Sequence, residues 1–324
     1  MPKKLLLLAA GLLVAIWLAT TPASYHEVGA HRIIGEVPAP LQSADVGDVI
    51  AEHSRTIADA LPGHDEVLPI PGTDSVLVSA RDEWIWKVDT TTGQAIKLAF
   101  SPVSPTGAKM QPGSDRFAYY CMARLDYHEY EHGPGLYRLD IQEGTFEPLV
   151  TRVPITGTLR DDGLELPNYD VANVAKVYPQ PFKETAVSRL NDSNSRMMQF
   201  CNDLDVSRSG KYIYMSEPFS HPKASSGLGA LPEAITLARN GRVWRYDTET
   251  GAVGLVVENS IFADGVLIEY DDQGNEKSLL LTETVNFLIC RAHLNGSRSG
   301  HYDILWDNLP AFPDGLDRDS EGRI

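Results

Sequence analysis

One phrase recurs along the chain: a run of alternating apolar and polar residues, a Lys or Arg, a polar turn with Gly, and a second such run. Alternation around a Gly-bearing turn is typical of a β-hairpin with one face buried against a neighbour. The copies are Trp84 to Leu98, Leu136 to Val150, Val243 to Val257 and, less regular, Leu288 to Leu305. Hairpins of one design predict a repeated β unit.

A second phrase, a turn followed by an apolar run, comes ahead of three of these hairpins, at Pro71 (PGTDSVLVSA), Ser207 (SRSGKYIYMSE) and Asp271 (DDQGNEKSLLLTE). Four strands per unit and a repeat of ~40 to 50 residues are typical of the blades of a β-propeller. The wider gap between the second and third hairpins indicates an insertion over residues 151–200, which carries several Pro. The sequence therefore favours an all-β propeller, with a β-sandwich or an up-and-down barrel as the competing all-β prediction.

Composition limits the partners that the chain can have. A chain of 324 residues with 43% hydrophobic residues can bury a sizeable core. The formal net charge of −16 argues against nucleic-acid binding, because phosphate contacts need clustered Lys and Arg and the sequence has no such cluster. An acidic chain can instead hold a cation, although solubility explains most of the charge.

The N-terminus has the three regions of a secretory signal. Lys3 and Lys4 precede a nearly uninterrupted apolar run, Leu5 to Ala19, and small residues follow up to Ala23. The apolar core is short for the ~20 residues of a spanning helix. We expect residues 1–23 to be a signal peptide or a retained membrane anchor and residues 24–62 to be a lead-in segment. The body, residues 63–324, is then expected outside the cytoplasm, as a secreted, periplasmic or membrane-anchored protein.

The three cysteines, Cys121, Cys201 and Cys290, are an odd number and match no metal-binding spacing. Each lies in a strand-like or apolar context. We therefore expect core residues, with a single disulfide as the alternative.

The segment His128 to His132 (HEYEH) matches the HExxH pattern of zinc proteases. That chemistry requires a helix, so that both imidazoles face one metal. A strand-like run lies just before the segment, and Gly133-Pro134-Gly135 lies just after it, which leaves room only for a turn. The context therefore argues against a zinc protease site.

Short polar residues recur where the predicted blades begin. In a propeller the innermost strand of each blade starts near the central channel, so equivalent positions converge. Carboxylate and amide oxygens that converge in this way suit a hard cation such as Ca²⁺, while the simpler interpretation is that each residue caps a turn. The segments are Gly63-His64-Asp65-Glu66, Phe200-Cys201-Asn202-Asp203, Phe262-Ala263-Asp264-Gly265 and Phe312-Pro313-Asp314-Gly315.

The chain resembles the strictosidine synthase-like family, in its adipocyte plasma membrane-associated branch, and more distantly paraoxonases and gluconolactonases. The runs that carry the resemblance are FCNDLDVSRSGKYIYMSEPFS, GRVWRYDTETGAVGLVVENSIFADGV, LLLTETVNFLICRAHLNG and DNLPAFPDGLDRDSEGR. The resemblance implies a six-bladed propeller with an axial Ca²⁺. The implied metal ligands are Asp65 or Glu66, Asn202, Asp264 and Asp314.

Departures from the family pattern affect the expected site. Asp65 and Glu66 stand in reversed order, Asp264 replaces the usual Asn, and Gly315 stands where the family often has Asn. The family pattern continues beyond Ile324, so we expect a chain truncated within the fifth blade.

The hydrolytic members of the family imply a calcium-dependent lactonase or arylesterase that acts on a small-molecule ester or lactone. In such an enzyme the cation polarises the carbonyl, and a base activates water. Asp203 and His128 are the candidate bases. The alternatives are a non-catalytic binding protein with structural calcium and a lyase of the strictosidine synthase type. The N-terminal segment, if uncleaved, is expected to bind a membrane.

Overall fold

Almost all regular structure in this computed structural model is β. Its described residues are 11–13, 54–58, 61–124, 132–161, 163, 165–166, 175–180, 182, 185–219, 231–319 and 321–324. Beyond the short helical stretch at 11–13, they contain one helix, α4 (Leu231–Thr236), and one 3-10 turn, η2 (Thr284–Asn286). The all-β prediction is confirmed.

The strands form three antiparallel sheets of four strands and one of five, each built on four consecutive strands that are neighbours, and we call these four-strand units blades 1 to 4. Blade 1 is β1 (His64–Pro69), β2 (Ser75–Ala80), β3 (Trp84–Asp89) and β4 (Ala95–Phe100). Blade 2 is β5 (Ser104–Met110), β6 (Phe117–Ala123), β7 (Gly135–Asp140) and β8 (Thr145–Val150). Blade 3 is β14 (Leu204–Val206), β15 (Tyr212–Glu217), β16 (Gly241–Asp247) and β17 (Val253–Ser260). Blade 4 is β18 (Ala263–Tyr270), β19 (Glu276–Glu283), β20 (Leu288–His293) and β21 (Tyr302–Trp306).

All four predicted hairpins are present, as the last two strands of each blade. In three blades one Asp closes the turn between these strands in the same way. The Asp89 Oδ1 accepts hydrogen bonds from the amides of Thr91 (2.9 Å) and Thr92 (2.7 Å), and the Gly93 amide donates to the Asp89 carbonyl at 2.8 Å. Asp140 and Asp247 make the equivalent bonds. The glycine of each turn has a positive φ, which glycine adopts readily. An Asp and a Gly at this fixed spacing therefore predict the hairpin turn from the sequence.

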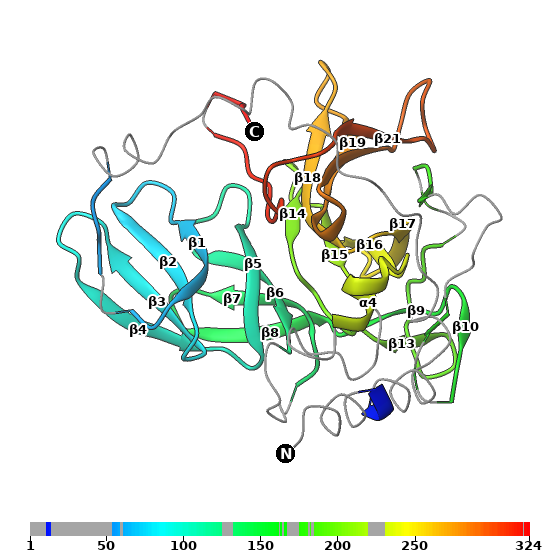
Figure 1. Cartoon of the computed structure of the whole chain (residues 1–324). Helices are drawn as coiled ribbons and strands as arrows, with labels where there is room; N and C mark the ends of the chain where they lie inside the picture. Colours follow the sequence, from blue (N-terminus) through cyan, green and yellow to red (C-terminus); the bar gives the residue numbers. More distant parts are fainter. Residues whose placement is uncertain are drawn as a thin grey trace.

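The blades are arranged around their first strands. β1 lies against β5, β5 against β14, and β14 against β18. Figure 1 shows these strands towards the middle of the molecule, with β3 and β4 of blade 1 farther out. This is the radial arrangement of a β-propeller. The count of six blades and the expected truncation stay predictions.

Most of the core lies between successive blades, as three apolar clusters, one for each pair of neighbouring blades. A fourth, small cluster consists of Ala123, Phe200 and Phe219. Strand β6 contributes alternate residues to two of the three larger clusters, one on each of its faces. Tyr119 and Cys121 pack towards blade 3, whereas Tyr120 and Met122 pack towards blade 1. A strand that is buried on both faces reads as a continuous apolar run, which is why β6 has the sequence FAYYCMA.

The insertion predicted over residues 151–200 lies between blades 2 and 3 and forms several short strands. One of them extends blade 3, because β12 pairs with β17. The others form two small ribbons, β9 with β13 and β10 with β11. The insertion strands are β9 (Arg152–Pro154), β10 (Thr158–Leu159), β11 (Glu165–Leu166), β12 (Lys176–Val177) and β13 (Ser195–Met197).

The cysteine prediction is corrected in one respect. Cys121, Cys201 and Cys290 are all buried, as expected for core residues. However, Cys121 and Cys201 form a disulfide, and Cys290 is not disulfide-bonded. The disulfide joins β6 of blade 2 to the segment that leads into β14.

The predicted signal peptide or anchor, residues 1–23, lies outside the described residues except for 11–13. Within the part of the chain that the structure describes, no helix has the length and apolar character needed to cross a membrane.

Candidate functional site

An acidic centre forms where the first strands of the blades meet. Glu66 comes from β1 and Asp264 from β18, Asp203 directly precedes β14, and Asp314 lies in the segment after β21. Their mutual electrostatic influence shows that they are neighbours. The Glu66 carboxylate helps to raise the pKa of Asp203, and the carboxylates of Asp314 and Asp203 help to raise the pKa of Asp264. Asp264 and Asp314 are thus adjacent, while the joint role of Glu66, Asp203, Asp264 and Asp314 in one site stays a prediction.

Asp264 is the carboxyl of this group whose pKa is most strongly raised. It is buried, and burial first and the adjacent Asp314 carboxylate second hold its pKa well above the usual range. Thr284 Oγ1 lies 2.7 Å from Asp264 Oδ2 and can donate a hydrogen bond to it. The buried Oδ1 has no hydrogen-bond partner among the described residues. A shared proton or a bound cation would relieve the repulsion between these two adjacent carboxyls.

Two threonines hold the Asp314 segment against blade 4. Thr282 Oγ1 donates to the Asp314 carbonyl at 2.9 Å and accepts from the Gly265 amide at 2.6 Å. Thr284 Oγ1 also lies 2.6 Å from the Pro313 carbonyl. A Cβ on Gly265 would lie 2.4 Å from the Asp314 carbonyl oxygen, so this approach requires glycine.

Asn202 is held by its backbone. Its amide donates to the Ser216 carbonyl at 3.1 Å, and its carbonyl accepts from the Gly107 amide at 2.7 Å. These bonds tie the start of blade 3 both to its own second strand and to β5 of blade 2. Asn202 thus lies two residues before β14 begins, and its side chain is partly exposed.

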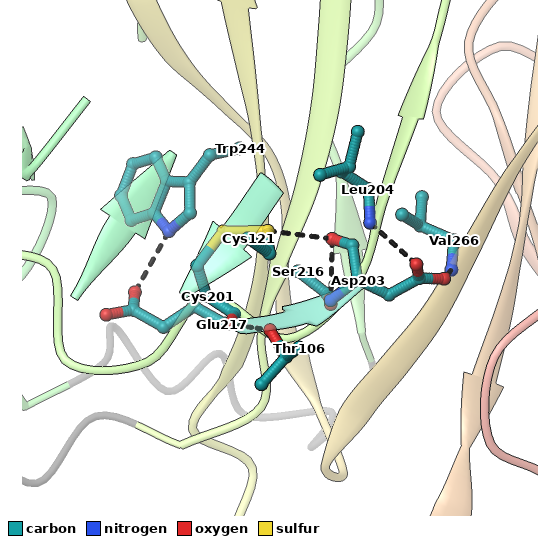
Figure 2. The surroundings of a disulfide bond; sticks show 9 residues. All are labelled: Thr106, Cys121, Cys201, Asp203, Leu204, Ser216, Glu217, Trp244 and Val266. Carbon is teal, nitrogen blue, oxygen red and sulfur yellow. Dashed lines mark hydrogen bonds between the residues drawn. A yellow bond between two sulfur atoms is a disulfide. The ribbon is translucent and has the colours of Figure 1, made fainter. Parts of the chain in front are cut away.

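Asp203 joins blade 3 to blade 4. Its Oδ1 accepts from the Leu204 amide at 2.8 Å, and its Oδ2 accepts from the Val266 amide at 2.9 Å (Figure 2). Burial raises the pKa of Asp203 to about 7, despite these bonds and the charge of Lys109. Asp205 accepts from the Ile268 amide at 2.8 Å, and burial raises its pKa to about 6.

Lys109 is a member of the site that the sequence reasoning missed. It lies on β5, the first strand of blade 2, and its Nζ is 3.0 Å from Asp317 Oδ1. Its charge also acts on Asp203 and Glu66. Burial raises the pKa of Glu66 in spite of Lys109. The signal that could have revealed Lys109 was a lone basic residue in an otherwise uncharged first strand.

Two candidates could not be placed. The side chain of Asp65 and all of His128 lie outside the described residues, as does the HExxH segment apart from His132. Their predicted roles as metal ligand and base stay predictions.

The oxygen atoms of the described candidate ligands are of the type that binds a hard cation. Asp264 and Asp314 supply carboxylates, Asn202 supplies an amide, and the unpaired Asp264 Oδ1 is a buried oxygen of the type that Ca²⁺ binds. Over the described residues, no three His, Cys, Asp or Glu side chains gather as metal ligands. A complete site would therefore need the amide of Asn202 or a further donor.

Comparison with known proteins gives relatives over part of the chain. The adipocyte plasma membrane-associated protein of Salmo salar is 39% identical over 127 residues, which are 39% of this chain and 29% of the relative. The protein of the same name from Danio rerio is 37% identical over the same shares of both chains. Strictosidine synthase-like 13 of Arabidopsis thaliana is 31% identical over 125 residues, 39% of this chain and 29% of the relative. The resemblance to strictosidine synthase-like proteins is confirmed.

The matches thus span less than a third of the length of these relatives. No family model matches the chain. Among solved structures, a gluconolactonase from Xanthomonas campestris has a TM-score of 0.38 at 11% identity, over 81% of both chains. The β-propeller domain of Myceliophteria thermophila Cps50 has a TM-score of 0.38 at 11% identity, over 74% of this chain and 58% of that one.

Proposed function

We propose that the acidic centre binds Ca²⁺ and that the protein is a hydrolase of lactones or aryl esters. The observation that carries the proposal is the Asp264–Asp314 carboxyl pair, with its unpaired buried oxygen at the meeting point of the blades. Asp264 is buried whereas Asp314 is exposed, and a buried carboxylate beside a second carboxylate is costly unless a proton or cation neutralises it. The resemblance to a family with hydrolytic relatives supports the choice of reaction.

Asp264, Asp314 and Asn202 would hold the cation, with Glu66 or Asp65 as a further ligand. A bound Ca²⁺ supplies polarisation of the substrate carbonyl. Asp203 can accept a proton near neutral pH, because its pKa is about 7 and each carboxylate oxygen keeps a free lone pair beside its one amide bond. Thr282 and Thr284 keep the Asp314 segment in place.

A specific observation favours a second candidate, a binding protein with structural calcium. Asp203 and Asp205 use their carboxylates to bind the backbone of the next blade, as purely structural residues would. In this alternative the cation stabilises the contact between blades and no ester is hydrolysed. A lyase of the strictosidine synthase type is the third candidate and has no observation of its own.

We also propose that the body lies outside the cytoplasm and is associated with a membrane. The relatives from fish are named as plasma membrane-associated proteins, and the Cys121–Cys201 disulfide fits an oxidising compartment. The basic and apolar N-terminal run supports a signal or anchor.

The test starts from protein treated with chelator and then dialysed. Ca²⁺ binding is measured by calorimetry, and turnover of phenyl acetate and dihydrocoumarin is measured with and without Ca²⁺. Asp264→Ala, which removes the side-chain oxygens, and Asp314→Asn are expected to lose both binding and turnover while staying folded. Asp272→Asn, at an exposed turn, is the matched control. If Ca²⁺ only raises the melting temperature and no ester is hydrolysed, the structural alternative holds.

A further inference from the structure

A separate cavity of about 340 Å³ lies between blade 2 and the insertion. It is lined where β6 ends, at Arg124, and along β13 and the residues after it, up to Gln199. Three arginines line the cavity: Arg124, Arg152 and Arg196. The rest of its wall is partly apolar. A volume of this size suits a small organic molecule.

A buried ionic network fixes Arg196 at this cavity. Arg196 Nε donates to Glu165 Oε2 at 2.5 Å, and its Nη1 and Nη2 donate to the two oxygens of Glu217, each at 2.8 Å. All three side chains are at most 3% exposed. The Glu217 carboxylate is itself oriented by the Trp244 indole at 2.9 Å (Figure 2). The charge of Arg196 is therefore fully compensated, and the wall that it forms is rigid.

Arg152 is compensated as well. Its Nη2 lies 3.0 Å from Asp192 Oδ1 and donates to the Ser195 carbonyl at 2.9 Å, and its Nε donates to Ser195 Oγ at 2.9 Å. The position of its guanidinium is thus set by the β9–β13 ribbon.

Arg124 has no such partner among the residues that the structure describes. Its Nε is buried, and it has no hydrogen bond within the described part of the chain. A cation with a buried, unpaired donor at a cavity wall is a ready site for an oxyanion, because the guanidinium fork matches a carboxylate. Arg124 thus leaves one positive charge uncompensated among the groups that line the cavity.

The remaining walls suit the organic part of such a ligand. Leu159, Met197 and Met198 line the cavity. Methionine side chains adapt to ligands of irregular shape. Apolar walls around an isolated cation favour an organic carboxylate over a free inorganic anion.

The cavity and the acidic centre lie at the same end of blade 3. Gln199 lines the cavity, and Asn202 is three residues farther along the chain, which is at most ~11 Å. On the neighbouring strand β15, Glu217 accepts a hydrogen bond from Arg196. Next to it, the Ser216 hydroxyl accepts from the Asp203 amide and donates to the Asp203 carbonyl. Figure 2 shows Glu217 and Asp203 on opposite sides of the Cys121–Cys201 disulfide.

We propose that this cavity binds the carboxylate of a small organic acid through Arg124. If the acidic centre is an esterase or lactonase, which this further step assumes, the preferred substrates carry a free carboxylate, and Arg124 anchors it while the ester group reaches the centre.

The binding test is made in chelator, so that it does not depend on the proposed hydrolysis. Phenylacetate and its neutral isostere phenylacetamide are titrated into the full chain by calorimetry. Phenylacetate is expected to bind, and phenylacetamide is expected to bind roughly tenfold more weakly or not at all. Arg124→Gln is expected to weaken phenylacetate binding roughly tenfold or more. Arg298→Gln removes an exposed charge on another blade and is expected to change nothing.

Arg124→Lys keeps the charge and is expected to lose less affinity than Arg124→Gln, which also guards against a folding defect in the latter. Equal binding of acid and amide, no binding of either, or unchanged affinity in Arg124→Gln would overturn the site. Binding of inorganic phosphate without binding of phenylacetate would overturn it too.

The link to the acidic centre has its own readout. In Ca²⁺, 4-nitrophenyl hemisuccinate, which carries a carboxylate, is compared with neutral 4-nitrophenyl butyrate. Arg124→Gln is expected to raise KM roughly tenfold for the first ester alone. Failure of both esters in the unmodified protein, with phenylacetate binding intact, would reject the hydrolase and keep the carboxylate site.

Discussion

Asp203 Oδ2 accepts a hydrogen bond from the Val266 amide at 2.9 Å and thereby joins the first strand region of blade 3 to the first strand of blade 4. Two residues along both strands, Asp205 Oδ2 accepts from the Ile268 amide at 2.8 Å. Neighbouring first strands of a propeller belong to different sheets and share no backbone ladder. Here two side chains take the place of that ladder.

Replacement of Asp205 is expected to weaken the contact between blades. Asp205→Ala would leave the Ile268 amide without its acceptor, at a cost of about 1–3 kcal/mol in the free energy of unfolding. Asp205→Asn keeps an oxygen acceptor, so we expect a smaller loss. Urea unfolding of the two variants measures the difference, with Asp272→Ala as a control at an exposed turn. An equal loss in the Ala and Asn variants would mean that the hydrogen bond is not what matters.

Stability of the chelated protein is expected to fall as pH rises. Burial raises the pKa of Asp205 to about 6 and that of Asp203 to about 7, both above the usual value of 3.8. A carboxyl that binds its proton more tightly in the folded state stabilises the fold below the unfolded pKa and loses this contribution as pH rises through the folded pKa. Melting temperatures between pH 4 and pH 8 test this. Asp205→Asn should flatten the dependence, and a profile that rises from pH 5 to pH 8 would contradict it.

The buried ionic network of Arg196, beside the cavity that Arg124 lines, predicts a larger loss of stability. Glu217→Gln would leave the Arg196 guanidinium with Glu165 as its only carboxylate among the described residues. Removing one partner of a buried ion pair costs about 3–5 kcal/mol. Glu249→Gln disrupts an exposed pair with Lys211 and should change stability little. Chemical denaturation compares the two variants, and a mild effect of Glu217→Gln would show that the network tolerates a neutral partner.

The Cys121–Cys201 disulfide is expected to stabilise the contact between blades 2 and 3. The two cysteines are 80 residues apart, and a disulfide that closes a long loop contributes about 2–4 kcal/mol. Cys121→Ser, or reduction, should lower the melting temperature. Cys290→Ser removes a buried sulfur that is not part of a disulfide, and it separates the loss of the bond from the loss of a buried sulfur. If reductant leaves the melting temperature unchanged, the bond is absent or unimportant in solution.

Features that repeat along the chain were predictable from the sequence, whereas contacts that occur once between distant segments were not. The hairpins follow from an Asp and a Gly at fixed spacing, whose turn bonds form within five residues. The convergence of Asp264 and Asp314 followed from their recurrent place at blade starts. The pairing of Cys121 with Cys201, the blade-joining bonds of Asp203 and the position of Lys109 depend on how distant strands meet, which no local pattern records.

Two glycines near the acidic centre make a matched pair for testing the cation site. A Cβ at Gly265 would meet the Asp314 carbonyl oxygen at 2.4 Å, whereas a Cβ at Gly315 would meet nothing within 4 Å. Gly265→Ala should therefore push the Asp314 segment away from Asp264 and lower Ca²⁺ affinity at least roughly tenfold, since one carboxylate ligand is displaced. Gly315→Ala adds the same methyl group and should bind Ca²⁺ as the unmodified protein does. Calorimetric titration of both variants decides the matter, because equal affinities would mean that Asp314 is not a ligand.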